Sequence, residues 1–347
     1  MTVSYSKKKE LLYNVFFLVV FVLLFAVAGF RPVGFDRDSE NYSRIIESII
    51  TTPSYGFVEG PSFYLIVKLS SVLFKDVVRG VFIIYALLGV LLTLYAIRKI
   101  STYPILSLIV YVLLYFPLHA MTQFRLSVAA AIFLLSIPDI VNRNWKSYLV
   151  KTVFAISFHY IAFIMLFIYF IKSKREGICF YLFLPLIGFL LAIINAMGFI
   201  VRYINLAGFL IFKNHYIEYI LNHYVEYVEL TKIGAINKSN IFNVYISSLL
   251  IIYYFAIVNI KKFTFSADLL MLKIFGWMLF AFYFLSFSQV ISGRISEFLG
   301  VVLIFFLPDL LCAFSKKREK LVMSFFVILY SVLMAINFIF IHKLFNF

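Results

Sequence analysis

Long apolar runs recur from one end of the chain to the other. They cover residues 11–30, 61–74, 80–97, 104–118, 124–141, 149–171, 178–199, 241–260, 268–290, 296–314 and 321–341. The runs are continuous, and many reach the length at which a helix crosses the hydrocarbon core of a bilayer. A transmembrane barrel would show alternating polarity in short strands instead. The pattern predicts an all-α, polytopic integral membrane bundle of about nine to eleven segments, some of them re-entrant.

Two polar stretches, residues 31–60 and 200–240, are longer than ordinary loops. Because no soluble domain, internal repeat or low-complexity linker interrupts the pattern, we predict a single membrane-embedded domain over residues 1–347. The first apolar run follows Lys7–Lys9 and is long enough to span. This favours an uncleaved first helix over a removed signal peptide.

The composition agrees with a membrane protein. Of the 347 residues, 64% are hydrophobic and 14% are charged, whereas soluble domains have about 25% charged residues. The formal charge of +15 therefore reflects short basic loops that contact lipid headgroups and set orientation, and no nucleic-acid partner is predicted. Cys179 and Cys312 show neither a disulfide framework nor metal-ligand spacing.

The basic residues predict an orientation. Cytoplasmic loops are enriched in Lys and Arg, and the basic groups that fit this rule are Lys7–Lys9, Lys172 with Lys174 and Arg175, Lys261 with Lys262, and Lys316–Lys320. Stretches 31–60 and 200–240 then face outward. Eleven plain spans would also place the pairs Arg98/Lys99 and Arg143/Lys146 outside, against the rule. If segments 61–74 and 149–171 both dip into the membrane and return, those pairs move inside and residues 119–125 move outside.

The densest charge lies directly behind the first span. Arg31, Asp36, Arg37, Asp38 and Tyr42 fall within residues 29–42. The planar guanidinium of arginine is preferred for binding phosphate oxygens through two hydrogen bonds. The neighbouring carboxylates can bind sugar hydroxyls or act as a base. The alternative is an ordinary solvated loop that contacts headgroups, and the loop alone does not decide between the two.

Other polar residues stand at the ends or in the middle of apolar runs. Glu59 precedes Pro61 and is either a helix-dipole charge or a carboxylate that faces substrate. Arg125 opens an alanine-rich run and either snorkels or holds a phosphate at a helix start. His159 lies within a span and is either a satisfied interhelical residue or a proton acceptor. Arg294 lies in a predicted hinge between two spans, where a plain turn is the alternative.

The outer stretch contains a tyrosine-rich amphipathic segment, residues 215–229. Its polar stripe includes His215, Glu218 and Glu226, flanked by Tyr219. Such a helix ordinarily lies in the membrane interface, although aromatic rings beside acids also suit carbohydrate. Two short HxxE pairs are weak evidence for a metal, and neither a metal nor a cofactor is predicted. Few charges lie inside the spans, chiefly Lys68 and Lys273, which argues against an ion-coupled pump.

In their order and context along the chain, these motifs resemble those of the EpsG-like/Wzy family of bacterial polysaccharide polymerases. The resemblance covers most of the chain and rests on Arg31…Gly34-Phe35-Asp36-Arg37-Asp38…Asn41-Tyr42, Glu59-Gly60, Gln123-Phe124-Arg125, Phe158-His159 and Arg294…Glu297-Phe298. It implies a glycosyltransferase of the bacterial inner membrane, whose site faces the periplasmic side. The substrate implied is an undecaprenyl-pyrophosphate-linked oligosaccharide, and the protein partners implied are a chain-length regulator and a flippase of the same pathway.

The same resemblance implies roles for the candidate residues. Arg31, Arg125 and Arg294 would hold the departing pyrophosphate, and the catalytic candidates are Asp36, Asp38, Glu59 and His159. Tyr42, His215, Glu218, Tyr219 and Glu226 would line the glycan path. Two other classes of function stay open. A lipid-linked oligosaccharide flippase would need a charged cavity that opens to both faces, and a membrane O-acyltransferase would need a donor path from the cytoplasm.

Overall fold

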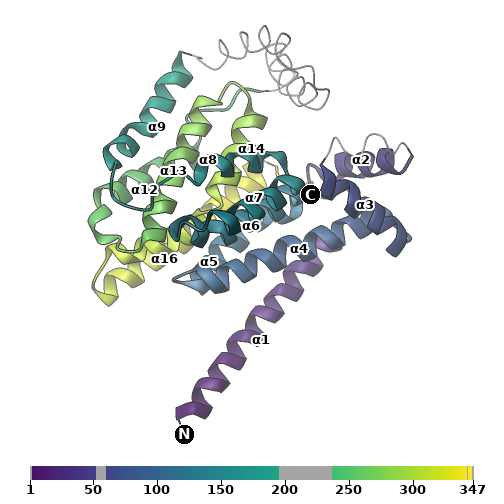
Figure 1. Cartoon of the computed structure of the whole chain (residues 1–347), viewed down its shortest axis with the longest axis horizontal. Helices are drawn as coiled ribbons and strands as arrows, with labels where there is room; N and C mark the ends of the chain where they lie inside the picture. Colours follow the sequence, from purple (N-terminus) through teal and green to yellow (C-terminus); the bar gives the residue numbers. More distant parts are fainter. Residues whose placement is uncertain (1, 52–59, 195–236, 342, 346–347) are drawn as a thin grey trace. The chain divides into compact units, whose positions relative to one another are not determined.

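The computed structural model describes residues 2–51, 60–194, 237–341 and 343–345 (Figure 1). These residues are mostly helical and contain no strand, apart from an isolated antiparallel bridge between Asp36 and Phe345. The predicted all-α membrane bundle is confirmed. The chain divides into two compact units: unit 1 comprises residues 1–139, 144–165 and 318–347, and unit 2 comprises residues 140–143 and 166–317.

Unit 1 holds the N-terminal helices and the last helix of the chain. Its elements are α1 (Thr2–Gly29), α2 (Ser39–Thr51), α3 (Pro61–Leu73), α4 (Val77–Ile100), α5 (Pro104–Val110), the π-helix η2 (Tyr111–Thr122), most of α6 (Phe124–Val141), α7 (Trp145–Phe158), the 3₁₀ turn η3 (Tyr160–Ile164), α16 (Lys317–Ile336) and the π-helical turn η6 (Asn337–Ile341).

Unit 2 is organised around one buried helix, α13. Its elements are α8 (Met165–Ile168), α9 (Ile178–Ile193), α12 (Val244–Val258), η4 (Ile260–Lys262), α13 (Ser266–Phe284), α14 (Gln289–Gly300), α15 (Leu303–Asp309) and η5 (Leu310–Ala313). Helix α13 packs against α9, α12, α14 and α15. The packing with α9 is close, because a Cβ placed on Gly188 would lie 2.9 Å from the Phe280 carbonyl oxygen.

Within the described residues, six helices are long and apolar enough to cross a membrane, and a bent pair raises this to seven. They are Glu10–Gly29, Val77–Ile100, Pro104–Thr122, Phe124–Val141, Ser266–Phe284 and Lys317–Phe340, with Gln289–Gly300 plus Leu303–Ala313 as the pair bent by 54°. Three shorter apolar helices, α3, α9 and α12, lie beside them. The chain is a multi-pass membrane protein, and the predicted number of segments includes such short helices.

Helices α1 and α4 pack antiparallel. Arg98, near the end of α4, donates to Asn14 of α1 at 2.5 Å, whereas Gly29 at the end of α1 lies against Ile83 near the start of α4. The C-terminal end of α4 therefore lies at the same end of the pair as the start of α1. Both helices are long enough to span, so the chain between them, including α3, returns to the side from which it left. This path is the one predicted for a re-entrant segment 61–74.

Segment 149–171 is not one continuous helix. Helix α7 ends at Phe158, and after His159 the chain turns back through η3 and α8. The Tyr148 hydroxyl donates to the Met165 carbonyl oxygen at 2.6 Å, which joins the two arms. Farther down, Arg143 donates to the carbonyl oxygens of Tyr169 at 2.6 Å and Ile171 at 3.0 Å. The out-and-back path is confirmed, whereas the expectation that His159 lies in the middle of a continuous span is wrong.

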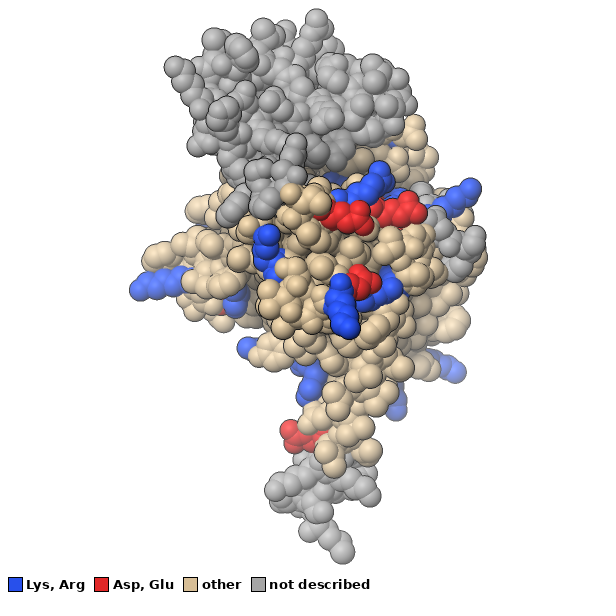
Figure 2. All heavy atoms as spheres, turned by 90° about the vertical axis from the view of Figure 1, so that its right-hand side faces the viewer, with Lys and Arg blue, Asp and Glu red and all other residues tan. Residues whose placement is uncertain are grey.

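The polar stretch after the first span contains an amphipathic helix, α2. Its Tyr42, Ile46 and Ile49 are buried, while Glu40 and Glu47 are exposed. Figure 2 looks onto the side on which α2 and α3 lie and shows acidic and basic side chains close together on an otherwise mainly uncharged surface. The sequence pattern over residues 31–60 concealed this helix, because its apolar face is short beside the neighbouring spans.

Several charged residues are buried near the ends of apolar helices. In unit 1, Asp139 is buried and accepts from Lys151 at 2.5 Å. In unit 2, Asp268 and Asp309 are buried and hydrogen-bonded to each other, and Lys273 donates to two backbone carbonyl oxygens. Because the three carboxylates stand at the ends of their helices, they do not contradict the expectation of few charges well inside the spans. These carboxylates lie near the ends of apolar runs, where sequence alone does not separate a buried acid from a loop residue.

Candidate anion-binding site in unit 1

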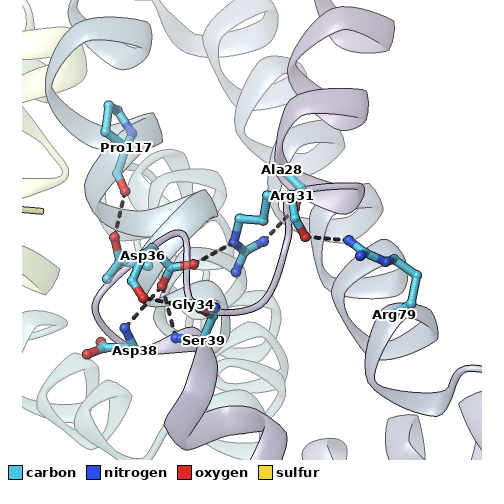
Figure 3. Close-up of polar contacts among 9 residues, drawn as sticks. Ala28, Arg31, Gly34, Asp36, Asp38, Ser39, Arg79 and Pro117 are labelled. Carbon is cyan, nitrogen blue, oxygen red and sulfur yellow. Dashed lines mark hydrogen bonds and ion pairs between the residues drawn. The ribbon is translucent and has the colours of Figure 1, made fainter. Parts of the chain in front are cut away.

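The charged loop behind α1 folds around the Asp36 carboxylate (Figure 3). Gly34 adopts φ 87°, a left-handed conformation that glycine tolerates best, and its N–H donates to Ser39 Oγ at 2.9 Å. Asp36 Oδ1 accepts the backbone N–H groups of Asp38 and Ser39, each at 3.1 Å. Asp36 therefore satisfies orphan donors at the N-terminus of α2, as a capping carboxylate does.

The other oxygen of Asp36 fixes Arg31. Arg31 Nε donates to Asp36 Oδ2 at 2.8 Å, and both side chains are buried. Nη1 donates to the Ala28 carbonyl oxygen, and the guanidinium lies 4.4 Å from the centre of the Phe82 ring. Burial lowers the pKa of Arg31, and the Asp36 charge opposes that shift. The carboxylate thus keeps a cation in a place that desolvation disfavours.

One end of the Arg31 guanidinium is left available. Among the described residues, Arg31 Nη2 is buried and has no hydrogen-bond partner. The backbone of Arg31 is held from the opposite side, because Arg79 of α4 donates to its carbonyl oxygen (Figure 3). A buried donor without an acceptor costs about 1–3 kcal/mol. A fixed cation with a spare donor is a binding element for an oxygen-rich anion.

Arg31 and Arg125 border the same aromatic cluster. The cluster contains rings from five helices: Tyr42 (α2), Phe63 (α3), Phe82 and Tyr85 (α4), Phe124 (α6) and Phe158 (α7). Phe124 lies at its centre, with ring-centroid distances of 4.0 Å to Tyr42, 4.7 Å to Tyr85 and 5.4 Å to Phe82. We call this set the aromatic cluster. It brings residues that are far apart in sequence into one place.

Arg125 contributes the second cation. Its guanidinium lies 5.0 Å from the centre of the Phe63 ring and 5.4 Å from that of Tyr42. The side chain is half-buried, so it forms the more accessible edge of the cluster. Tyr42, Phe63 and Arg125 all stand in the first turn of their helices. Helix N-termini favour negative charge, and here α3 and α6 contribute without an acidic cap of the kind that Asp36 gives α2.

The segment before Arg125 is irregular. Residues Tyr111–Thr122 form a π-helix that contains Pro117, and Gln123 donates from its backbone to the Leu118 carbonyl oxygen at 3.1 Å. π-Helical turns inside membrane helices commonly occur at functional sites. Here the wider turn ends immediately before α6, so it sets where the first turn of α6 begins.

His159 lies at the tip of the hairpin formed by α7 and η3. The tip touches the start of α3, since Ser62 Oγ and Ser157 Oγ are 2.6 Å apart. His159 Nδ1 accepts the N–H of Ile161 at 3.3 Å. A neutral imidazole that accepts at Nδ1 carries its proton on Nε2. Nδ1 of His159 is therefore engaged with the backbone, and the catalytic role of the imidazole stays a prediction.

The site loop has a second backbone partner near the C-terminus. The Arg37 N–H donates to the Leu344 carbonyl oxygen at 3.3 Å, next to the bridge between Asp36 and Phe345. The rings of Phe35 and Phe345 stack with centroids 5.1 Å apart. This contact gives the loop a second anchor besides Arg79.

The remaining candidate residues lie apart from the contacts of Arg31 and Arg125 or outside the described residues. Asp38 lies on the same loop with its side chain 26% exposed, 3.7 Å from Arg37 Nε. Arg294 belongs to unit 2 and lies inside α14, so the predicted hinge at this position is wrong; the break after α13 falls at residues 285–288. Candidates outside the described residues are Glu59, His215, Glu218, Tyr219 and Glu226.

Several residues of the site were missed in the sequence. Phe82 and Tyr85 are hidden inside an apolar run, where rings of this kind are common. Arg79 stands three residues after Asp76, the N-cap of α4, and an arginine in a first helical turn carries no particular signal. Leu344 and Phe345 lie some 300 residues from the loop that they contact, and no pattern in the sequence links the two.

A comparison with protein families matches the EpsG family over residues 14–347. The chain belongs to the EpsG family. The match spans both units and every candidate residue above. Neither a curated protein nor a solved structure matches the chain significantly. In this EpsG-family protein the two arginines, the buried carboxylate and the aromatic cluster of unit 1 all lie within the matched region.

Proposed function

We propose that this EpsG-family protein is a polysaccharide polymerase that joins lipid-linked oligosaccharide repeat units. The observation that carries the proposal is the convergence of Arg31 and Arg125 on one aromatic cluster, at the first turns of three helices. Two cations and the N-termini of α3 and α6 suit a diphosphate, which carries its charge on several oxygens. Rings beside the cations suit the apolar faces of sugars.

The reaction is a glycosyl transfer. A hydroxyl oxygen of the acceptor unit forms a bond to the anomeric carbon of the donor glycan, and the bond from that carbon to the undecaprenyl pyrophosphate oxygen breaks. The pyrophosphate leaves with the electron pair, and the hydroxyl proton passes to a base. Arg31 and Arg125 neutralise the charge that develops on the leaving group, which is the largest electrostatic demand of the step. The role of Arg294 in holding pyrophosphate remains a proposal that rests on the family resemblance alone.

The carboxylates divide into two roles. Asp36 positions Arg31 and caps α2, since both of its oxygens already accept hydrogen bonds. The base is then Asp38, which keeps a partly exposed carboxylate, or Glu59, which immediately precedes Gly60 and α3. His159 donates from Nε2 to substrate. Tyr42 lines the glycan path, and the proposed path continues along residues 215–229.

The site is proposed to face the outer side of the bacterial inner membrane. Three helix ends support this orientation, because a cluster of basic residues stands at the start of α1, at the end of α4 and at the start of α16. The antiparallel packing of α1 and α4, together with the contact of Leu344 with the site loop, puts these ends opposite the loop. Basic residues concentrate on the cytoplasmic side. A chain-length regulator and a flippase remain expected partners.

The test is the glycan ladder of the native host after Arg125→Gln, with Arg44→Gln as the matched control. Arg44 is exposed on α2, where its Nε donates to the Glu40 carbonyl oxygen at 3.5 Å. We expect the ladder to collapse to a single repeat unit for the first variant and to persist for the second. Loss of all surface glycan, including the single unit, would instead indicate a flippase. An unchanged ladder with altered acyl content would indicate an acyltransferase.

A further inference from the structure

Tyr85 is a buried tyrosine whose hydroxyl lacks a partner in the described part of the chain. It stands on α4, is 1% exposed, and its ring packs against Phe124 at 4.7 Å and against Phe63 and Phe158 at 6.1 Å each. No hydrogen bond to its hydroxyl oxygen is found among those residues. A phenylalanine would fill the same space without this cost, which is about 1–3 kcal/mol for an unsatisfied buried group. Such a group in a native fold calls for an explanation beyond packing.

The position of the hydroxyl supplies one. The Phe63 ring neighbours both Tyr85, at 6.1 Å, and the Arg125 guanidinium, at 5.0 Å. The Phe124 ring likewise neighbours Tyr85, at 4.7 Å, and the Arg31 guanidinium, at 6.0 Å, whose Nη2 is another buried donor without a partner among the described residues. Tyr85 therefore brings a desolvated donor to the same aromatic cluster that both cations border.

We infer that the Tyr85 hydroxyl donates a hydrogen bond to a phosphate oxygen of the pyrophosphate that Arg31 and Arg125 hold, an inference that rests on the proposed function. Tyr85 is then a binding residue and transfers no proton. The hydroxyl supplies a neutral, directional donor within the aromatic cluster that both cations border. Because it is shielded from water, it needs no reorganisation when the anion arrives.

A binding role for the Tyr85 hydroxyl and a structural role predict different effects on stability and on affinity. Tyr85→Phe removes the unsatisfied hydroxyl and keeps the ring, so the protein should be as stable as the parent or more so. The same change removes a hydrogen bond to a charged group, which corresponds to about 10- to 100-fold weaker binding of the diphosphate. A purely structural tyrosine would show the reverse, with lower stability and unchanged affinity.

Tyr253→Phe is the matched control. Tyr253 is a buried tyrosine of unit 2 whose hydroxyl donates to the Tyr181 carbonyl oxygen at 2.6 Å. Its loss leaves a carbonyl without its partner, so we expect lower stability and unchanged diphosphate binding. The two variants each remove one tyrosine hydroxyl, but Tyr85→Phe is predicted to lower affinity without loss of stability, and Tyr253→Phe to lower stability without loss of affinity.

The experiment uses the full chain in lipid nanodiscs, with undecaprenyl pyrophosphate as the probe and undecaprenyl monophosphate for comparison. Affinity and thermal stability are measured for the parent, Tyr85→Phe, Tyr253→Phe and Arg125→Gln. Weak diphosphate binding by both Tyr85→Phe and Arg125→Gln, with Tyr85→Phe fully stable, supports the inference. Weak binding by Arg125→Gln alone overturns the role of Tyr85 and leaves the proposed function standing. Parent-like binding by both variants overturns the proposed anion site itself, and loss of stability in Tyr85→Phe shows a structural hydroxyl instead.

Discussion

The buried pair of Arg31 and Asp36 gives the sharpest stability prediction, through the substitution Asp36→Asn. The two groups are 2.8 Å apart, and their side chains are 2% and 0% exposed. The asparagine side chain has nearly the same shape, and its oxygen can still accept the N–H groups at the start of α2. The substitution therefore removes the charge of the carboxylate and leaves the helix cap in place.

The magnitude follows from burial. Removing one member of a buried ion pair costs about 3–5 kcal/mol, because the other charge stays desolvated without compensation. Arg31 keeps its bond to the Ala28 carbonyl oxygen and its contact with the Phe82 ring, so we expect the lower end, about 3 kcal/mol. The exposed pair of Lys172 and Glu176 is 3.7 Å apart with side chains 68% and 64% exposed. Glu176→Gln should then cost about 0.5 kcal/mol or less.

The assay is the free energy of unfolding in mixed micelles, measured by titration with a denaturing detergent. Besides the two single variants, the double variant Arg31→Met/Asp36→Asn is measured. Replacing both charges removes the stranded cation, so the double variant should regain at least half of the loss and still fail to bind diphosphate. A loss for Asp36→Asn no larger than that for Glu176→Gln would refute the reasoning. So would a double variant no more stable than Asp36→Asn.

Three further predictions test the membrane topology, the helix packing and the loop contact. In a cysteine-free background, a cysteine at Asn41 should react with an impermeant thiol reagent added outside intact cells, whereas one at Trp145 should react only after permeabilisation; the opposite labelling would reject the re-entrant topology. Gly89→Ala would place a Cβ 2.7 Å from a serine hydroxyl of α6 and should lower the free energy of unfolding by about 1–3 kcal/mol. A Cβ at Gly293 would lie 3.8 Å from the nearest atom, so Gly293→Ala should be neutral or stabilising. Phe345→Ala should speed hydrogen exchange of the site loop by at least tenfold, and unchanged exchange would show that the ring stack does not hold it.

The residues that meet in unit 1 were largely predictable from sequence. The predictable residues stand beside spans, where charge is costly: Arg31, Asp36, Tyr42 and Arg125. The order of these motifs along the chain also matches that of one family. The return path through segment 149–171 also followed from charge, because the positive-inside rule conflicted with a plain count of spans. In both cases the physical signal was strong and local, a polar group beside a bilayer.

The finer geometry was not predictable, for physical reasons that differ from residue to residue. The break at His159 lies in a run whose hydrophobicity continues on both sides, so periodicity cannot mark it. Tyr85 is one of 24 tyrosines, and its hydroxyl becomes unusual only when its surroundings contain no acceptor. Whether Asp36 acts as a base or fixes Arg31 depends on which atoms approach its two oxygens, and spacing along the chain does not specify that.

The contact between the site loop and residues 344–345 has a consequence for biosynthesis. The loop is made directly after the first membrane helix, whereas its backbone partner is made roughly 300 residues later, so the loop must wait through the insertion of nearly every other span. The proposed diphosphate site is thus completed by the last described segment of the chain. A ribosome-bound or prematurely terminated polypeptide would carry Arg31 and Arg125 without the finished loop. Unfinished chains would then be unable to sequester a lipid carrier that the cell must recycle.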